Sequence, residues 1–339
     1  MIENPIYYII SIILLFNIIF LIFHKNIANF LQLYDEVNNK RKIHRERVAI
    51  TGGIYIFINF FLISVSKIIF VSTFGFEIPN DNFNVDPILI FLILIFFIGL
   101  YDDKYIMTAN IKFFLSIIVV GLFISTQPDY LISFLKFNFL DLEFNVHQYR
   151  YFLTLLCFML FINACNMFDG INGQSSSYFI FILVYLQIIS GTDFFLLSMV
   201  ISIIMYLYLN ITNKSFLGDG GIFLLSFLIA GIIIKKFQSD QLYSDQIFLI
   251  MLIPGLDMLR LFIQRIMNKK NPFLADNNHI HHLLLKKFSK RYTVIIIQLL
   301  IIIPNFLALI FSAYMLNIIL STIIYLFLFI TLSAYPRKD

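Results

Sequence analysis

Residues 293–313, TVIIIQLLIIIPNFLALIFSA, form a long apolar run without a charged side chain. An α-helix needs about 20 mostly apolar residues to cross the hydrocarbon core of a bilayer, so this stretch alone predicts a membrane-spanning helix. Comparable runs recur along the 339 residues, of which 60% are hydrophobic. A soluble domain is only about 45–50% apolar. The sequence therefore predicts an all-α integral membrane protein with about eleven transmembrane helices.

The expected spans are separated by short polar segments, with no soluble domain or internal repeat between them, so we expect one polytopic domain over residues 1–339. The runs are continuous, whereas a β-barrel would show short alternating segments. The expected spans are residues 6–24, 50–72, 86–101, 111–126, 150–166, 176–191, 194–211, 221–235, 247–262, 293–313 and 317–335. Cys157 and Cys165 lie on one of these helices, eight residues apart, and imply no disulfide framework.

The positions of the basic residues predict the orientation. If the loop at 25–48 is cytoplasmic, 19 of the 24 Lys and Arg fall on cytoplasmic segments. Loops rich in Lys and Arg stay on the cytoplasmic side. We therefore expect the N-terminus outside and the C-terminus in the cytoplasm. The aromatic-rich middle of the outer segment 127–149, Tyr130 to Phe144, could lie along the membrane interface.

Two adjacent carboxylates, Asp102 and Asp103, end the third expected helix in the stretch YDDKYIMTANIKF, residues 101–113. Such a pair repels unless a cation or a proton offsets it, and hard oxygen ligands suit Mg²⁺. Lys112 opens the next helix and could hold a phosphate. A polar loop that merely stops the helix is the plain alternative.

Asn163, Asn166 and Asp169 are spaced three residues apart in NACNMFDGINGQ, residues 163–174, which would place them on one helix face. Polar groups at the end of a membrane helix need polar partners. The glycines that follow allow a tight turn that can approach a ligand. Helix–helix hydrogen bonding is the weaker alternative.

Asp219 sits among glycines at an expected helix start in FLGDGGIFLL, residues 216–225. Backbone N–H groups at a helix start can face a phosphate, and Asp219 could ligate a metal bound to it. A simple N-cap by Asp219 would not need the surrounding glycines.

A fourth stretch, residues 257–285, begins with DMLRLFIQRI and contains three histidines, His279, His281 and His282. They lack a nearby cysteine, so a structural zinc site is the less favoured interpretation. We expect a phosphate-binding face formed with Arg265, although a basic loop that binds anionic lipid headgroups is also consistent.

A further basic segment, residues 34–54, contains Lys42, His44 and the pair Gly52–Gly53. Alone, such a basic run indicates the orientation of the chain in the membrane more often than a binding site.

Taken together, these five motifs resemble the polyprenyl-phosphate N-acetylhexosamine-1-phosphate transferases of glycosyltransferase family 4. That family includes the undecaprenyl-phosphate GlcNAc-1-phosphate transferases and the phospho-MurNAc-pentapeptide transferases. The resemblance covers nearly the whole chain, with the five motifs in order from about residue 34 to 285. The form His-Ile-His-His, after Pro272-Phe273 and Asp276, is closer to the GlcNAc-1-phosphate branch.

The resemblance assigns a role to each candidate residue. The implied catalytic residues are Asp102, Asp103, Lys112, His279, His281 and His282. The implied substrate-binding residues are Lys42, His44, Asn163, Asn166, Asp169, Asn172 and Arg265. Asp219 and Asp102 would ligate Mg²⁺, or Mn²⁺ in its place. Two positions depart from the family pattern, since Asn172 replaces an Asp and Gly221 a frequent Ser, which suggests a divergent member.

The activity implied is transfer of N-acetylhexosamine 1-phosphate from a UDP-N-acetyl sugar to undecaprenyl phosphate, with release of UMP, as the initiating step of a cell-surface polysaccharide such as O-antigen. The expected location is the bacterial inner membrane, with the active site facing the cytoplasm. Membrane lipid and a second copy of the chain are expected partners, and nucleic acid is not. The alternatives are a phospho-MurNAc-pentapeptide transferase, a membrane transporter, or a scaffold.

Overall fold

A computed structural model describes residues 5–36, 47–74, 86–139, 142–271 and 278–334. The described chain is dominated by α-helices, and nine of its helices are long and apolar enough to cross a membrane. Every expected span coincides with a helix, which confirms an all-α, multi-pass membrane protein.

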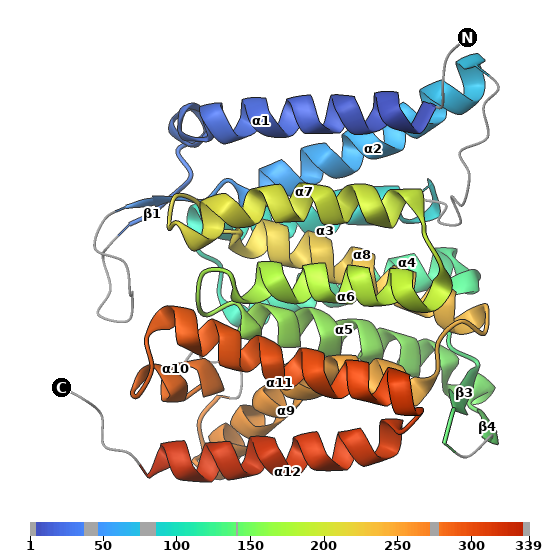
Figure 1. The fold of residues 1–339 in the computed structure, drawn as a ribbon, viewed down its shortest axis with the longest axis vertical. Helices are drawn as coiled ribbons and strands as arrows, with labels where there is room; N and C mark the ends of the chain where they lie inside the picture. Colours follow the sequence, from blue (N-terminus) through green and yellow to red (C-terminus); the bar gives the residue numbers. More distant parts are fainter. Residues whose placement is uncertain (1–4, 37–46, 75–85, 140–141, 272–277, 335–339) are drawn as a thin grey trace. The chain divides into compact units, whose positions relative to one another are not determined.

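The chain forms two compact units, the first comprising residues 1–108 and 179–232. Its elements, some shared with the second unit, are α1 (Pro5–Leu31), β1 (Tyr34–Asp35), β2 (Val48–Ala49), α2 (Gly52–Phe74), α3 (Asp86–Tyr105), most of α6 (Gln174–Ser190), α7 (Phe194–Ile211) and the larger part of α8 (Gly218–Gln238). The strands β1 and β2 pair antiparallel and connect α1 to α2 (Figure 1).

Buried polar side chains join α2 and α7 within this unit. The Tyr55 hydroxyl donates to the Ser202 carbonyl at 2.8 Å, and the Ser202 hydroxyl donates to Asn59 Oδ1 at 2.9 Å. Hydrogen bonds between Ser, Asn and backbone groups hold membrane helices together because apolar contact alone gives little preference over lipid.

The second unit comprises residues 109–178 and 233–339. Its own elements are α4 (Ala109–Thr126), η1 (Pro128–Tyr130), β3 (Phe134–Phe137), β4 (Leu142–Asn145), η2 (His147–Tyr149), α5 (Arg150–Phe168), α9 (Ser244–Met267), α10 (Ile280–Leu285), α11 (Lys290–Phe311) and α12 (Tyr314–Ser333). Figure 1 shows the hairpin β3–β4 and the short helix α10 at opposite ends of this unit.

The helices α4 and α5 pack antiparallel. Phe123, near the end of α4, meets Phe158, in the middle of α5, edge to face, with 5.6 Å between the ring centroids. The backbone N–H of Ile132, beyond α4, donates to the Thr154 hydroxyl at 2.9 Å. Eleven residues separate Phe123 from Lys112, and eleven separate Phe158 from Asp169. Since both helices rise by about 1.5 Å per residue, Lys112 and Asp169 lie at about the same level, at the end opposite the hairpin.

The segment 127–149 contains the hairpin β3–β4, in which Phe134 pairs with Asn145, a structure that the sequence did not predict. One sequence-based expectation needs correction. The first helix continues to Leu31, past the expected end at residue 24, and stops at Gln32, whose φ of 56° is left-handed. Polar residues can end the membrane-embedded part of a helix without ending the helix, because its backbone hydrogen bonds do not depend on side-chain polarity.

Candidate functional site

The first unit brings together three carboxylates that we call the aspartate cluster: Asp102, Asp103 and Asp219. The first two lie in the last turns of α3, beyond its apolar run, and the third in the first turn of α8. Asp103 accepts hydrogen bonds from two backbone N–H groups at the start of α8, those of Asp219 at 2.7 Å and Gly220 at 3.0 Å. Asp103 therefore anchors α8 to α3, with its charge at the positive end of the α8 dipole.

The sequence predicted that N–H groups at this helix start would face a phosphate. The structure corrects this for two of them, because Asp103 is their partner. The neighbouring Asp102 carboxylate accepts the backbone N–H of Met107 and closes the turn after α3. The adjacent carboxylates thus have different local partners.

Glycines allow this close approach. A Cβ atom built on Gly99 would lie 2.5 Å from the Asp219 carbonyl carbon and oxygen, and one on Gly53 would lie 2.6 Å from the Gly221 nitrogen. Side chains cannot fit at either position without separating the helices. The pair Gly52–Gly53 therefore packs the start of α2 against α8.

The aspartate cluster concentrates negative charge. Burial, followed by repulsion from Asp219, holds the pKa of Asp103 well above its usual range. No three His, Cys, Asp or Glu side chains form a metal-binding group in the part of the chain that the structure describes. Mg²⁺, however, is usually held by one or two carboxylates together with water and substrate phosphates. The half-buried Asp102 and Asp219 offer that chemistry.

The second unit contains the histidine cluster, His279, His281 and His282, at the start of α10. The rings of His279 and His281 stack with centroids 5.2 Å apart and planes 6° apart, and His282 lies 4.4 Å from His281. Burial, together with the two neighbouring imidazoles, holds the pKa of His281 well below its usual value. His281 is therefore neutral at physiological pH.

The turn after α5 lies directly against this cluster. The backbone of Gly170 touches the His281 imidazole so closely that any Cβ at position 170 would overlap the ring. The structure therefore brings together two motifs that are about 110 residues apart in the sequence.

Asp169 precedes that glycine. It is exposed to solvent, yet the protein that surrounds its carboxyl group raises its pKa to about 6. The expected common face of Asn163, Asn166 and Asp169 is only partly right. The α5 helix ends at Phe168, and Asp169 is its C-cap, with φ −79° and ψ 64°. The Asn163 side chain donates to the Met159 carbonyl in its own helix at 2.7 Å.

Other expected site residues occupy the same unit. Lys112 is half-buried in the first turn of α4, and Asn172 is half-buried in the turn between α5 and α6. Arg265 is buried, with 6% of its surface exposed, in the last turn of α9. Lys42 and His44 lie outside the described residues, as do Pro272, Phe273 and Asp276.

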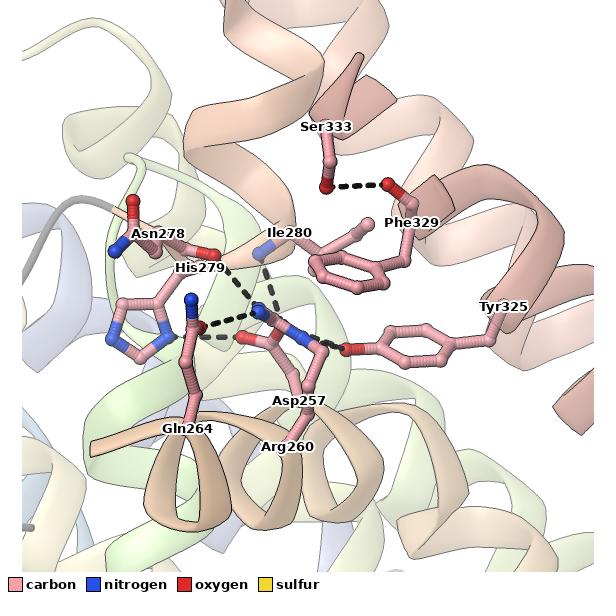
Figure 2. A network of polar contacts seen from close by, with 9 residues as sticks. All are labelled: Asp257, Arg260, Gln264, Asn278, His279, Ile280, Tyr325, Phe329 and Ser333. Carbon is pink, nitrogen blue, oxygen red and sulfur yellow. Dashed lines mark hydrogen bonds and ion pairs between the residues drawn. The ribbon is translucent and has the colours of Figure 1, made fainter. Parts of the chain in front are cut away.

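Asp257, Arg260 and Tyr325 had no role among the expected site residues, although the first two lie in the fourth stretch, 257–285. Asp257 binds His279 through its side chain, and Arg260 and Tyr325 bind Asp257 (Figure 2). A signal was present, because Asp257 and Arg260 are charged residues three positions apart within an apolar run. Ionisable groups inside membrane helices are uncommon and usually paired.

The model of the family described as glycosyl transferase family 4 matches residues 86–236, a range that includes the aspartate cluster. The chain is 27% identical over 304 residues to the undecaprenyl-phosphate alpha-N-acetylglucosaminyl 1-phosphate transferase of Escherichia coli K12, covering 85% of this chain and 78% of the relative. It is 28% identical over 286 residues to the probable undecaprenyl-phosphate N-acetylglucosaminyl 1-phosphate transferase of Bacillus subtilis 168, covering 81% of this chain and 76% of the relative.

Proposed function

We propose that the chain transfers N-acetylhexosamine 1-phosphate from a UDP-sugar to undecaprenyl phosphate, because its residues 86–236 match the model of glycosyl transferase family 4. The names of its relatives in Escherichia coli and Bacillus subtilis support this activity. The observation in the structure that most supports it is the aspartate cluster, in which Asp103 at the end of α3 binds the start of α8 beside Asp219. A transporter would instead be expected to bind its substrate near the bilayer midplane.

In the proposed reaction, an oxygen of the lipid phosphate attacks the phosphorus that carries the sugar. The bond from that phosphorus to the bridging oxygen breaks, and UMP leaves with that oxygen. One phosphoanhydride replaces another, so the difficulty lies in bringing two anions together and stabilising the charge on the transferring group.

Asp219 and Asp102 are the residues that would hold Mg²⁺ or Mn²⁺, and the bound metal would supply positive charge to the diphosphate. Asp103 would keep Asp219 in place through the start of α8. Because both Asp103 oxygens already accept N–H groups, we assign it a positioning role and not that of a nucleophile.

The residues of the second unit supply cationic and hydrogen-bonding groups. Lys112 and Arg265 would bind phosphate oxygens, where positive charge stabilises the transition state. The histidine cluster would contact the transferring phosphate, and Asn163, Asn166, Asp169 and Asn172 would bind the nucleotide sugar.

The proposed location is the bacterial inner membrane, with both clusters on the cytoplasmic side, where nucleotide sugars are present. The positive-inside distribution of Lys and Arg supports this orientation.

The test measures UMP release by purified protein in detergent with undecaprenyl phosphate, Mg²⁺ and, in separate reactions, UDP-GlcNAc and other UDP-N-acetyl sugars. We expect release that requires both the lipid and Mg²⁺ and that is lost in Asp219→Asn. The sugar that supports release identifies the donor. Folded protein that releases no UMP with any donor would refute the proposal.

A further inference from the structure

Asp257 is a buried carboxylate whose two oxygens are almost fully hydrogen-bonded. Its exposed fraction is 4%. Figure 2 shows it at the centre of a polar network. Oδ2 lies 2.9 Å from His279 Nδ1. Oδ1 accepts from the Arg260 guanidinium at 2.8 Å, the Tyr325 hydroxyl at 2.9 Å and the Ile280 backbone N–H at 3.0 Å.

The same network holds the chain on both sides of His279. Arg260 donates to the carbonyl of Asn278 at 2.7 Å, while Asp257 accepts the N–H of Ile280. Arg260 also donates to the Tyr325 hydroxyl at 3.0 Å and lies over the Phe329 ring at 4.3 Å. The residues at the start of α10 are thus fixed by side chains from two membrane helices, α9 and α12.

These contacts determine which nitrogen of His279 carries a proton. A charged donor and two neutral donors on Oδ1 favour the ionised form of Asp257. A carboxylate only accepts hydrogen bonds, so Nδ1 of His279 must donate to it. Nε2 is then the nitrogen that can take up a proton or bind a phosphate oxygen when protonated.

We propose that Asp257 is a positioning residue that fixes the orientation and tautomer of His279 for the transfer reaction. This inference rests on the proposed function and adds a residue to it. The competing explanation is that Asp257 merely neutralises Arg260 in the membrane and has no effect on the reaction. The two explanations differ in what Asp257→Asn does to His279.

The orientation of an asparagine at this position follows from the network. Three donors face Oδ1, so the amide oxygen must take that side and the NH₂ group must face His279 Nδ1. Nδ1 can then only accept, and the proton moves to Nε2. The substitution therefore keeps the size of the side chain and reverses the tautomer.

The first experiment is a double-mutant cycle on UMP release, made of Asp257→Asn, His279→Gln and the double variant. We expect Asp257→Asn to lower kcat by about 10- to 100-fold, with a smaller change in KM, as for other residues that orient a functional histidine. In the His279→Gln background the same substitution should change kcat by less than about twofold, because residues that act through one another are not additive. An equal loss in both backgrounds would overturn the proposal.

The matched control is Asp245→Asn. Asp245 is also a buried aspartate of α9, with 2% of its surface exposed, but it lies at the start of the helix and accepts backbone N–H groups of Asn138 and Gln246. We expect its kcat to stay within about twofold of the parent. If Asp257→Asn does not fold, Tyr325→Phe removes one donor from Asp257 and should lower kcat only when His279 is present.

A second readout does not depend on activity. In ¹⁵N-histidine-labelled protein, solid-state NMR distinguishes the two tautomers, and the His279→Gln spectrum identifies the His279 signals. We expect a protonated Nδ1 in the parent and a protonated Nε2 in Asp257→Asn. An unchanged tautomer would overturn the inference even if the protein is a transferase. A parent protein with this tautomer and no UMP release would refute the proposed function alone.

Discussion

Gly99→Ala tests whether the backbone of α3 positions Asp219. The added Cβ would lie 2.5 Å from the carbonyl carbon and oxygen of Asp219 and 2.6 Å from Gly220 Cα. Ordinary contacts begin near 3.4 Å, so α3 and the start of α8 must separate by about 1 Å. Backbone atoms cannot rotate away as the end of a side chain can.

The expected effect has two parts. Overpacking of this kind destabilises a protein by about 1–3 kcal/mol. A displacement of about 1 Å in a group that positions substrate lowers the rate by about 100-fold. Gly99→Ala should therefore fold, with a lowered Tm, but release UMP about 100 times more slowly and need more Mg²⁺, although every carboxylate is still present.

The assay is UMP release against Mg²⁺ concentration, beside a thermal unfolding curve in the same detergent. Gly121→Ala is the matched control, because that glycine is also within a membrane helix and a Cβ there would meet nothing within 4 Å. A Gly99→Ala protein with the rate and Mg²⁺ requirement of Gly121→Ala would show that α3 does not set the position of Asp219.

Three further predictions concern single contacts. Gly170→Ala should displace the His281 ring, lowering Tm and slowing UMP release by at least about tenfold; an unchanged rate would place His281 elsewhere. Asp103→Asn leaves one N–H of α8 facing an amide NH₂ and should lower stability by about 1–3 kcal/mol, measured by chemical unfolding, while a gain in stability would contradict the anchoring role. Asp169→Asn should have a higher Tm than the parent at pH 8. The raised pKa of about 6 means that the ionised Asp169 carboxylate destabilises the folded state, and the amide removes this cost. The difference in Tm should vanish as the pH falls from 6 towards 3.8, where the carboxyl group is protonated in both states. A Tm difference independent of pH would argue against this origin.

The membrane helices could be predicted from the sequence because the bilayer imposes a strong and local constraint. A run of about 20 apolar residues has few other stable environments than lipid. The residues at which the helices begin and end were less predictable. The α9 helix begins at Ser244 and ends at Met267, whereas the apolar run predicted 247–262. Its last turns carry Arg260 and Arg265, whose long side chains are compatible with a helix that continues beyond the hydrocarbon.

The short segments that make up the candidate site could also be predicted, but the long-range hydrogen bonds between them could not. The turn after α5 and the glycine-rich start of α8 follow from nearby residues. The bond from Asp103 to the N–H of Asp219 joins positions 116 residues apart. The bond from Asp257 to His279 depends on how α9 and α10 pack. No local pattern specifies either pairing.

The structure explains the glycine pair Gly52–Gly53, which on the sequence alone was only a weak indication of a site. On its own the pair had little specificity, and Gly221 was noted only as a departure from the family's usual serine. In the structure, a Cβ on Gly221 would meet Leu217 at 2.7 Å and Gly53 Cα at 3.2 Å. A serine at position 221 would therefore require the Leu217 side chain to move and α2 to shift from α8 by a few tenths of an ångström. Because Gly53 and Gly99 both lie against the first turn of α8, that movement would also affect the backbone that Asp103 binds. The glycines and the aspartates thus form one structural unit, and the glycine at position 221 has a packing role between α2 and α8.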